Sequence, residues 1–189
     1  MIATKIITLK EDMIMKKFLL LTIMIFISIT LIAATPTIDG TLDGEMEVYK
    51  HPSGNYELYW KVLTDEEIYV AINAKTTGWV SVGFDPSFMM KDADIKIGNI
   101  VDGVVTLEDH YGTSATGHKQ DKENEIIEFA GKEENDWTFI EFIMPLDTAK
   151  ADDKAIIPGE QMKVIIAYSS STDALWRKHN FRGSTELVF

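Results

Sequence analysis

Cysteine is absent from all 189 residues of the chain, and this absence removes several kinds of chemistry. Without cysteine there can be no disulfide, no thiolate nucleophile, no cysteine-ligated zinc or iron–sulfur site and no thioether attachment of a c-type haem. Lipoprotein processing, which needs a cysteine at its cleavage site, is excluded as well. Any fold that this chain adopts is therefore held together by its core.

Positive charge is also scarce. The chain has 18 Lys and Arg against 30 Asp and Glu, which gives a formal net charge of −12 at pH 7. Binding to nucleic acid needs a basic footprint that can neutralise phosphates. We therefore expect no nucleic-acid partner, and the acidic balance favours solubility.

The N-terminus has the pattern of an export signal. Lys16-Lys17 precede an apolar run from Phe18 to Ile32, which closes on the small pair Ala33-Ala34. This pattern predicts a signal peptide over residues 1–34. The run to Ala34 approaches the roughly 20 residues of a membrane span, so an uncleaved anchor is the alternative. We expect a periplasmic or extracellular domain over residues 35–189, either free or tethered to the membrane.

The rest of the chain is patterned for short strands. Apolar and polar residues alternate from Tyr56 to Val62 and again from Ile68 to Ala74, and a period of two indicates half-buried strands. The patterns predict further strands at Trp79–Phe84, Ala93–Ile100, Val104–Tyr111, Glu125–Ala130, Trp137–Met144, Gln161–Ser169 and Thr185–Phe189. The first three strands are expected to form a meander.

The spacing of these strands predicts the fold class. No stretch after residue 34 keeps a period of 3.6, and Asp102-Gly103 is a strong tight-turn signal between two strands. We expect an all-β, immunoglobulin-like antiparallel β-sandwich with Val80, Val82, Phe84, Phe142 and Ile166 in its core. Three irregular stretches, at 85–92, 112–124 and 169–183, are the expected places for a site.

Several spaced motifs resemble the DOMON family. The main stretch runs from Gly78 to Pro86, as Gly-Trp-Val-Ser-Val-Gly-Phe-Asp-Pro, and continues in Met90-Lys91-Asp92-Ala93-Asp94. Further matching motifs are Asp109-His110-Tyr111, Gly117-His118, Glu141-Phe142, Pro145-Leu146-Asp147-Thr148 and His179 with Arg182-Gly183. The resemblance covers roughly residues 55–189 and implies the same sandwich fold.

A second, shorter motif resembles another family of the same architecture. The opening Ile38-Asp39-Gly40-Thr41-Leu42-Asp43-Gly44 is similar to the first strand and turn of family nine carbohydrate-binding modules. The wider superfamily divides by ligand. Some members, such as the cytochrome domain of cellobiose dehydrogenase, bind haem b, while others bind sugars or act as interaction modules, so the fold alone does not decide the function.

The DOMON resemblance implies a set of haem-binding residues. The axial ligands of haem-binding members correspond here to Met90 and His179, and a thioether with an imidazole suits low-spin iron. Residues beside them would form the walls of a noncovalent haem b pocket, namely Phe88, Met89, Trp176 and Phe181. Arg182, together with Arg177 and Lys178, would neutralise the propionates.

Other assignments stay open at the level of sequence. Met89 is the register alternative to Met90, and His118 in its Gly-rich loop competes with His179 for the iron. His110 is expected to pack or to hydrogen-bond. Trp176, the one tryptophan expected in a loop, is the candidate platform for a sugar.

Three functions are compatible with these residues, and none needs the chain to be a self-sufficient enzyme, because no nucleophile with its base is apparent. The first is a haem b electron-transfer domain that serves a redox partner protein or a membrane electron carrier. The second is a carbohydrate-binding or adhesive module whose partner is a glycan. The third is an assembly factor of the cell envelope.

Overall fold

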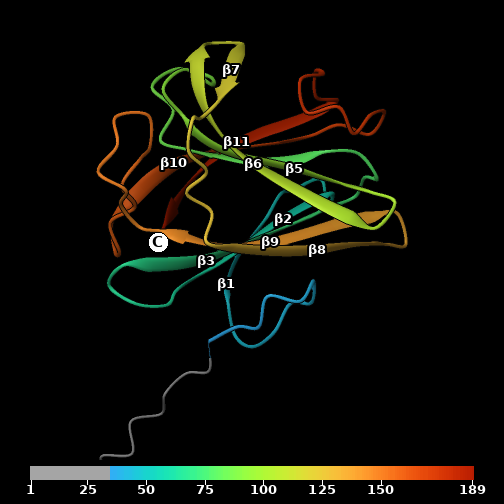
Figure 1. The fold of residues 1–189 in the computed structure, drawn as a ribbon, viewed down its shortest axis with the longest axis horizontal. Helices are drawn as coiled ribbons and strands as arrows, with labels where there is room; N and C mark the ends of the chain where they lie inside the picture. The colour runs from blue at the N-terminus through green and yellow to red at the C-terminus, as the bar shows by residue number, and fades with distance from the viewer. Residues whose placement is uncertain (1–34) are drawn as a thin grey trace, which may run out of the picture. The chain divides into compact units, whose positions relative to one another are not determined.

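The computed structural model describes residues 35–189, which form an antiparallel β-sandwich of two sheets (Figure 1). The predicted fold class is confirmed. The expected signal peptide or anchor at 1–34 lies outside the described residues. Within residues 35–189 we find no helix that is long and apolar enough to cross a bilayer.

The first sheet has five strands in the order β1-β2-β3-β9-β8, and every neighbouring pair is antiparallel. Its strands are β1 (Glu47–Lys50), β2 (Tyr56–Val62), β3 (Glu67–Ala74), β8 (Glu128–Glu134) and β9 (Trp137–Pro145). The interior position of β9, between β3 and β8, explains its composition. A strand with neighbours on both edges and cover on both faces has apolar residues at almost every position.

The second sheet has six strands in the order β11-β10-β4-β5-β6-β7, again antiparallel throughout. Its strands are β4 (Val80–Phe84), β5 (Asp94–Val101), β6 (Val104–Ser114), β7 (Gly117–Gln120), β10 (Gln161–Tyr168) and β11 (Phe181–Val188). The turn between β5 and β6 is built as predicted. Asp102 and Gly103 have φ of 52° and 78°, which matches the twist of a two-residue hairpin.

The main core lies between the two sheets. Val80, Val82 and Phe84 of β4, Phe142 of β9 and Ile166 of β10 are all buried there, as predicted. Burial of side chains of this size contributes roughly 1.5–3 kcal/mol each. This core fixes the faces of both sheets, because alternate residues of every strand must point outward.

The prediction that the first three strands form a meander is wrong. β2 and β3 pair with each other, but β4 belongs to the other sheet, and β3 takes β9 as its second neighbour. The chain crosses between the sheets at Thr76–Gly78, where Thr76 Oγ1 donates to the Ser169 carbonyl at 2.5 Å. A Cβ at Gly78 would lie only 2.3 Å from that same oxygen, so the crossing depends on glycine.

Two strands lie where none was expected. β1 and β7 have four residues each, too short for a detectable period of two. β7 lies inside the stretch 112–124, and β11 begins at Phe181 within the stretch 169–183. The β4–β5 connection and residues 169–180 of the β10–β11 connection keep the irregular backbone that the sequence predicted.

The opening motif Ile38–Gly44 has a structural role. Gly40, with φ of 87°, lies against the backbone of Gly131, and the segment covers the outer face of the five-stranded sheet. The backbone N–H groups of Asp39 and Gly40 donate to Oε1 of the buried Glu141 at 2.8 and 2.6 Å, and Tyr69 donates to its Oε2 at 2.6 Å. In this structure the motif therefore covers the sheet and anchors its own backbone on Glu141.

Candidate functional site

The outer face of the six-stranded sheet carries a second apolar cluster, formed by Trp79, Ala93, Ile95 and Ile97. These side chains point away from the sandwich core and are nevertheless buried. They are covered by Met90 of the β4–β5 connection and by Leu175 of the β10–β11 connection. The two connections that carry the predicted haem ligands therefore meet on one cluster, which we call the outer cluster.

The outer cluster contains an unsatisfied polar atom. Trp79 is only 4% exposed, and its indole Nε1 has no hydrogen-bond partner among residues 35–189. A buried N–H without an acceptor costs about 1–3 kcal/mol. Such a donor marks a place where a ligand with an acceptor would be stabilised.

Met90 is held in place by the neighbouring hairpin. Gly112 of β6 donates its N–H to the Ala93 carbonyl and accepts from Asp92 N, both at 2.8 Å. A Cβ at position 112 would lie 1.6 Å from the carbonyl oxygen of Met90, so only glycine permits this approach. The Met90 side chain is half-buried against the outer cluster.

The neighbours of Met90 point elsewhere. Phe88 is 63% exposed and forms an isolated bridge with Lys91. Met89 is exposed and has a φ of 55°. Of the two methionines in this connection, Met90 is therefore the one that packs on the outer cluster.

His179 lies half-buried in the β10–β11 connection. Burial lowers the pKa of its imidazole, and the nearby charges of Arg182 and Lys178 lower it further. A neutral imidazole is the form that ligates a metal. The backbone around it is anchored, since Asn180 N donates to the Tyr168 carbonyl at 3.0 Å and its Oδ1 accepts from Ser170 N at 2.9 Å.

The remaining predicted wall residues divide between the two sides of the sheet. Phe181 stacks on Tyr168 at 4.6 Å between ring centroids and packs against the main core. Arg182, the next residue, is exposed on the opposite face. Trp176 is 74% exposed, with the Arg177 guanidinium 4.3 Å from its ring. The structure therefore brings Met90, Leu175 and Trp79 together and leaves Phe88 and Phe181 apart from them.

A cavity of about 490 Å³ opens beside the β6–β7 hairpin. Figure 1 shows this hairpin and the β10–β11 connection rising from the same side of the sheet. Most of the lining residues are polar, among them His110, His118, Glu108 and Asp173, and Leu175 and Trp176 add apolar surface. Two of its acceptors, Asn99 Oδ1 and Asp173 Oδ1, are buried without a partner among the described residues. Its volume is within the usual range for small-ligand sites.

A hydrogen-bonded chain of side chains crosses the wall of this cavity. His118 Nδ1 lies 2.9 Å from His110 Nδ1, and His110 Nε2 lies 2.9 Å from Glu108 Oε2. Sequence reasoning treated the two histidines separately. They meet because β7 folds back on β6 with a register shift between Gly112 and Ser114.

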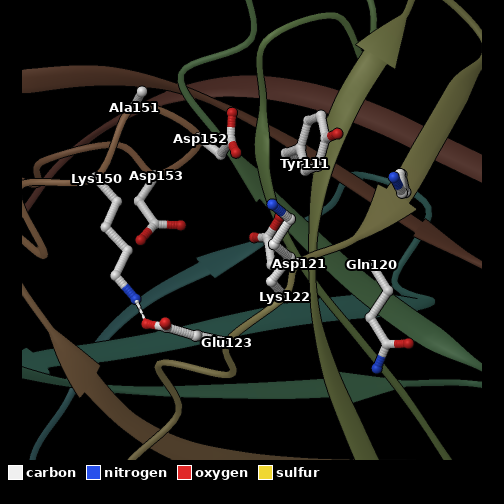
Figure 2. Close-up of a pocket in the computed structure, with 10 residues that line it drawn as sticks. Tyr111, Gln120, Asp121, Lys122, Glu123, Lys150, Ala151, Asp152 and Asp153 are labelled. Atoms are coloured by element: carbon white, nitrogen blue, oxygen red, sulfur yellow. Dashed lines mark hydrogen bonds and ion pairs between the residues drawn. The ribbon is translucent and has the colours of Figure 1, made fainter.

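A second cavity, of about 340 Å³, lies beside Tyr111 of β6 and the segment that follows β7 (Figure 2). Asp121, Asp152 and Asp153 line it, and Lys150 forms ion pairs with Glu123 and Glu125 at its rim. Both carboxylate oxygens of Asp121 are buried without a hydrogen-bond partner among the described residues. Burial, followed by the charges of Asp109 and Asp153, raises the pKa of Asp121 to about 6.

Beneath this cavity lies a buried ion cluster that sequence reasoning missed. Lys96 of β5 is 2% exposed, and its ammonium lies 2.6 Å from Asp94 Oδ1 and 2.5 Å from Asp109 Oδ1. Oxygens of Asp94, Asp109 and Asp153 lie within 4.8 Å of one another. The ammonium of Lys96 supplies positive charge to this cluster. A lysine between two isoleucines in a predicted strand was the available signal.

Comparison with known proteins agrees with this architecture. DBH-like monooxygenase protein 1 of Homo sapiens is 32% identical over 116 residues, and its counterpart from Mus musculus is 29% identical over 117 residues. These matches cover 61% and 62% of this chain but only 18% and 19% of the relatives, so the chain spans less than a fifth of their length.

Among solved structures, the cytochrome b domain of pyranose dehydrogenase from Coprinopsis cinerea superposes with a TM-score of 0.59 at 10% identity, covering 75% of this chain and 80% of that one. At this identity the match shows a shared fold alone. The model of the DOMON domain matches residues 52–169, which is more than half of the chain. The predicted resemblance is therefore confirmed, and the chain belongs to the DOMON family.

Proposed function

We propose that this domain binds one haem b noncovalently over the outer cluster and passes single electrons to and from a partner. The observation that carries the proposal is the meeting of the two ligand-bearing connections, with Met90 and Leu175, on one apolar cluster. Family membership and the shared fold with a cytochrome b domain support it.

The residues present fit such a group. Met90 would supply the thioether ligand and His179 the neutral imidazole, while the outer cluster would form the apolar surface beneath the ring. The Trp79 indole N–H lacks an acceptor, and a propionate would be one. Arg182 is exposed on the same face and would balance the second propionate. When bound, haem supplies a reversible one-electron couple.

Two backbone contacts would position the ligands of this group. The lack of a side chain at Gly112 lets the Met90 backbone lie directly against β6. The hydrogen bond from Ser170 N to Asn180 Oδ1 holds the loop that carries His179. We propose that the domain works after export, at the outer side of a membrane. Its partner would be a redox protein or a membrane electron carrier.

Haem reconstitution of the purified protein tests this proposal. A Soret band with a thioether-to-iron charge-transfer signal is expected. His179→Ala should weaken haem retention, while Met90→His should keep the haem and lower its potential, because a second imidazole favours the ferric state. Met89→Leu is the matched control and should behave like the parent protein.

Two results would revise this proposal. Absence of a Soret band after haem addition would overturn haem binding altogether. A spectrum that survives His179→Ala but is lost in His118→Ala would move the iron to the β6–β7 hairpin. Both outcomes are read from the spectrum and do not depend on the partner.

A glycan ligand is the second candidate, and the polar cavity beside the exposed Trp176 favours it. A sugar ring would stack on the indole and donate hydroxyl protons to Asn99 Oδ1 and Asp173 Oδ1, the buried acceptors without partners. Binding to a glycan array should then be lost in Trp176→Ala and kept in Met90→Leu. Retention of array binding by Trp176→Ala would exclude this site.

A further inference from the structure

We infer that His110 and His118 form a binding site for one divalent transition-metal ion, with Cu(II) as the preferred ion. The inference is independent of haem binding, because it rests on the β6–β7 hairpin and its cavity. The outer face of this hairpin carries both imidazoles, with their Nδ1 atoms 2.9 Å apart.

The existing hydrogen bonds prepare His110 for a metal. The Glu108 carboxylate only accepts hydrogen bonds, so His110 Nε2, 2.9 Å away, carries the proton that it donates. His110 Nδ1 then keeps its lone pair, and it faces His118. A carboxylate that orients a ligating imidazole through its far nitrogen is the usual outer shell of a metal-binding histidine.

His118 becomes a ligand by changing tautomer. Because His110 Nδ1 holds a lone pair, the proton of the 2.9 Å contact between the two Nδ1 atoms belongs to His118 Nδ1, which donates it to His110. If its proton moves to Nε2, a second lone pair becomes free at Nδ1, and a metal ion takes the place of the shared proton without net proton release.

The spacing of the nitrogens indicates which metal geometry suits the pair. Two nitrogens 2.9 Å apart, each about 2.0–2.1 Å from an ion, subtend an angle of about 90° at that ion. This is the angle between adjacent ligands in tetragonal Cu(II) or Ni(II) sites, whereas tetrahedral Zn(II) needs a wider angle. Cu(II) also binds nitrogen ligands most tightly of the divalent series.

The other coordination positions would face the cavity of about 490 Å³. Its polar lining, with Thr106, Gln120 and Asp173, suits water or a small anionic co-ligand. His118 is half-buried, so the ion can enter from solvent. His110 is only 8% exposed, so the position of its ring is fixed by the surrounding side chains. The site therefore has two protein nitrogens, one orienting carboxylate and open positions.

Titration of the haem-free protein with CuSO₄, followed by calorimetry and electron paramagnetic resonance, tests the inference. We expect one tetragonal Cu(II) per chain with nitrogen hyperfine structure, and weaker binding of ZnSO₄. His118→Ala should weaken Cu(II) binding at least tenfold, and Glu108→Gln should weaken it about 10–100-fold. His51→Ala, directly after β1 at the edge of the five-stranded sheet, is the matched control and should bind like the parent protein.

Because His110 is buried and His110→Ala can unfold the hairpin, the decision rests on His118 and Glu108. Unchanged Cu(II) affinity and spectrum in His118→Ala would overturn the site, as would absence of stoichiometric binding to the parent protein. A Soret band that is unchanged in His118→Ala while Cu(II) is lost would separate this site from haem binding. Failure of haem to bind would leave the Cu(II) result interpretable.

Discussion

At the scale of single residues, the ionisable groups inside the sandwich determine how its stability responds to substitution and to pH. Lys96 and its partners Asp94 and Asp109 are each at most 3% exposed. Burial raises the pKa of Asp94 to about 7, against the opposing effect of Lys96. Such a cluster contributes little net stability, but removing one member leaves an unpaired buried charge.

Lys96→Met should therefore destabilise the domain strongly. The expected loss is about 3–5 kcal/mol of unfolding free energy at pH 7, because two buried carboxylates lose their counter-ion. Urea unfolding measures it. Lys163→Met, at an exposed position of β10, is the matched control and should stay within about 0.5 kcal/mol. Equal effects of the two substitutions would contradict the role of Lys96.

Asp121 should make the domain more stable in mild acid. Its folded-state pKa of about 6 lies above the unfolded value of about 3.9, so between these values the folded protein binds more protons. Stability then rises as the pH falls from 6 towards 4. Asp121→Asn removes the buried charge and should stabilise the domain by about 1 kcal/mol at pH 8, a figure discounted for partial solvent exposure.

The gain from Asp121→Asn should shrink as the pH falls towards 4, where the parent carboxyl is protonated. Denaturant unfolding at pH 8, 6 and 4 follows this trend. Asp136→Asn removes one charge from the exposed β8–β9 turn and should change stability little at any of these values. A lower stability of Asp121→Asn at pH 8 would contradict the assignment.

At the scale of the strands and their connections, the sequence was a good guide to the presence of strands and a poor one to their partners. Alternation located β2, in which only one face is fully buried, and it also located β3, although residues on both faces of β3 are buried. Pairing is decided by contacts far apart in sequence, such as that of β3 with β9, and no local period contains that information. This is why the expected meander failed at Thr76–Gly78.

The same limit applies to the candidate site, where the sequence located the segments but not all of their contacts. Family motifs pointed to the β4–β5 and β10–β11 connections, and these do meet on the outer cluster. The contact of His118 with His110 was not foreseeable, because it depends on a four-residue strand and a register shift. The unsatisfied Trp79 Nε1 was hidden for a similar reason, since burial on an outer face requires knowledge of the covering loops.

The β4–β5 connection depends on one backbone contact, and Gly112→Ala tests it. The added Cβ would overlap the Met90 carbonyl at 1.6 Å, so the connection must move off the sheet. We expect a loss of about 2–3 kcal/mol, hence a Tm lower by about 5–10 °C, measured by calorimetry. Gly117→Ala, whose Cβ would meet only the hydroxyls of Ser114 and Thr113, is the control. A Tm that is equal in both variants would show that the connection can move away from the added Cβ at little cost in stability.

At the scale of the whole molecule, charge is distributed unevenly. The chain has a net charge of −12, yet Arg177, Lys178 and Arg182 lie close together in sequence beside His179, with no acidic residue between Asp173 and Glu186. The proposed haem site would thus lie under a local positive region of an acidic protein. The screening length is about 8 Å at 0.15 M salt, so an approaching ion then feels only the charges near its contact point. At 0.01 M salt the screening length is about 30 Å, so the ion feels the net charge of the whole protein.

These two ranges predict an unusual salt dependence for electron transfer from the haem-loaded protein to ferricyanide, an anionic oxidant. At 0.01 M salt the net charge should repel the oxidant, and raising the salt to 0.15 M should increase the rate because the repulsion is screened first. Stopped-flow mixing measures this rate. At 0.15 M, Arg177→Ala and Lys178→Ala should slow the reaction, while Lys132→Ala on β8 should leave it unchanged. A rate that falls steadily as salt is added would mean that the local cations outweigh the net charge at every salt concentration. A rate that is unchanged in Arg177→Ala would place the haem edge away from the β10–β11 connection.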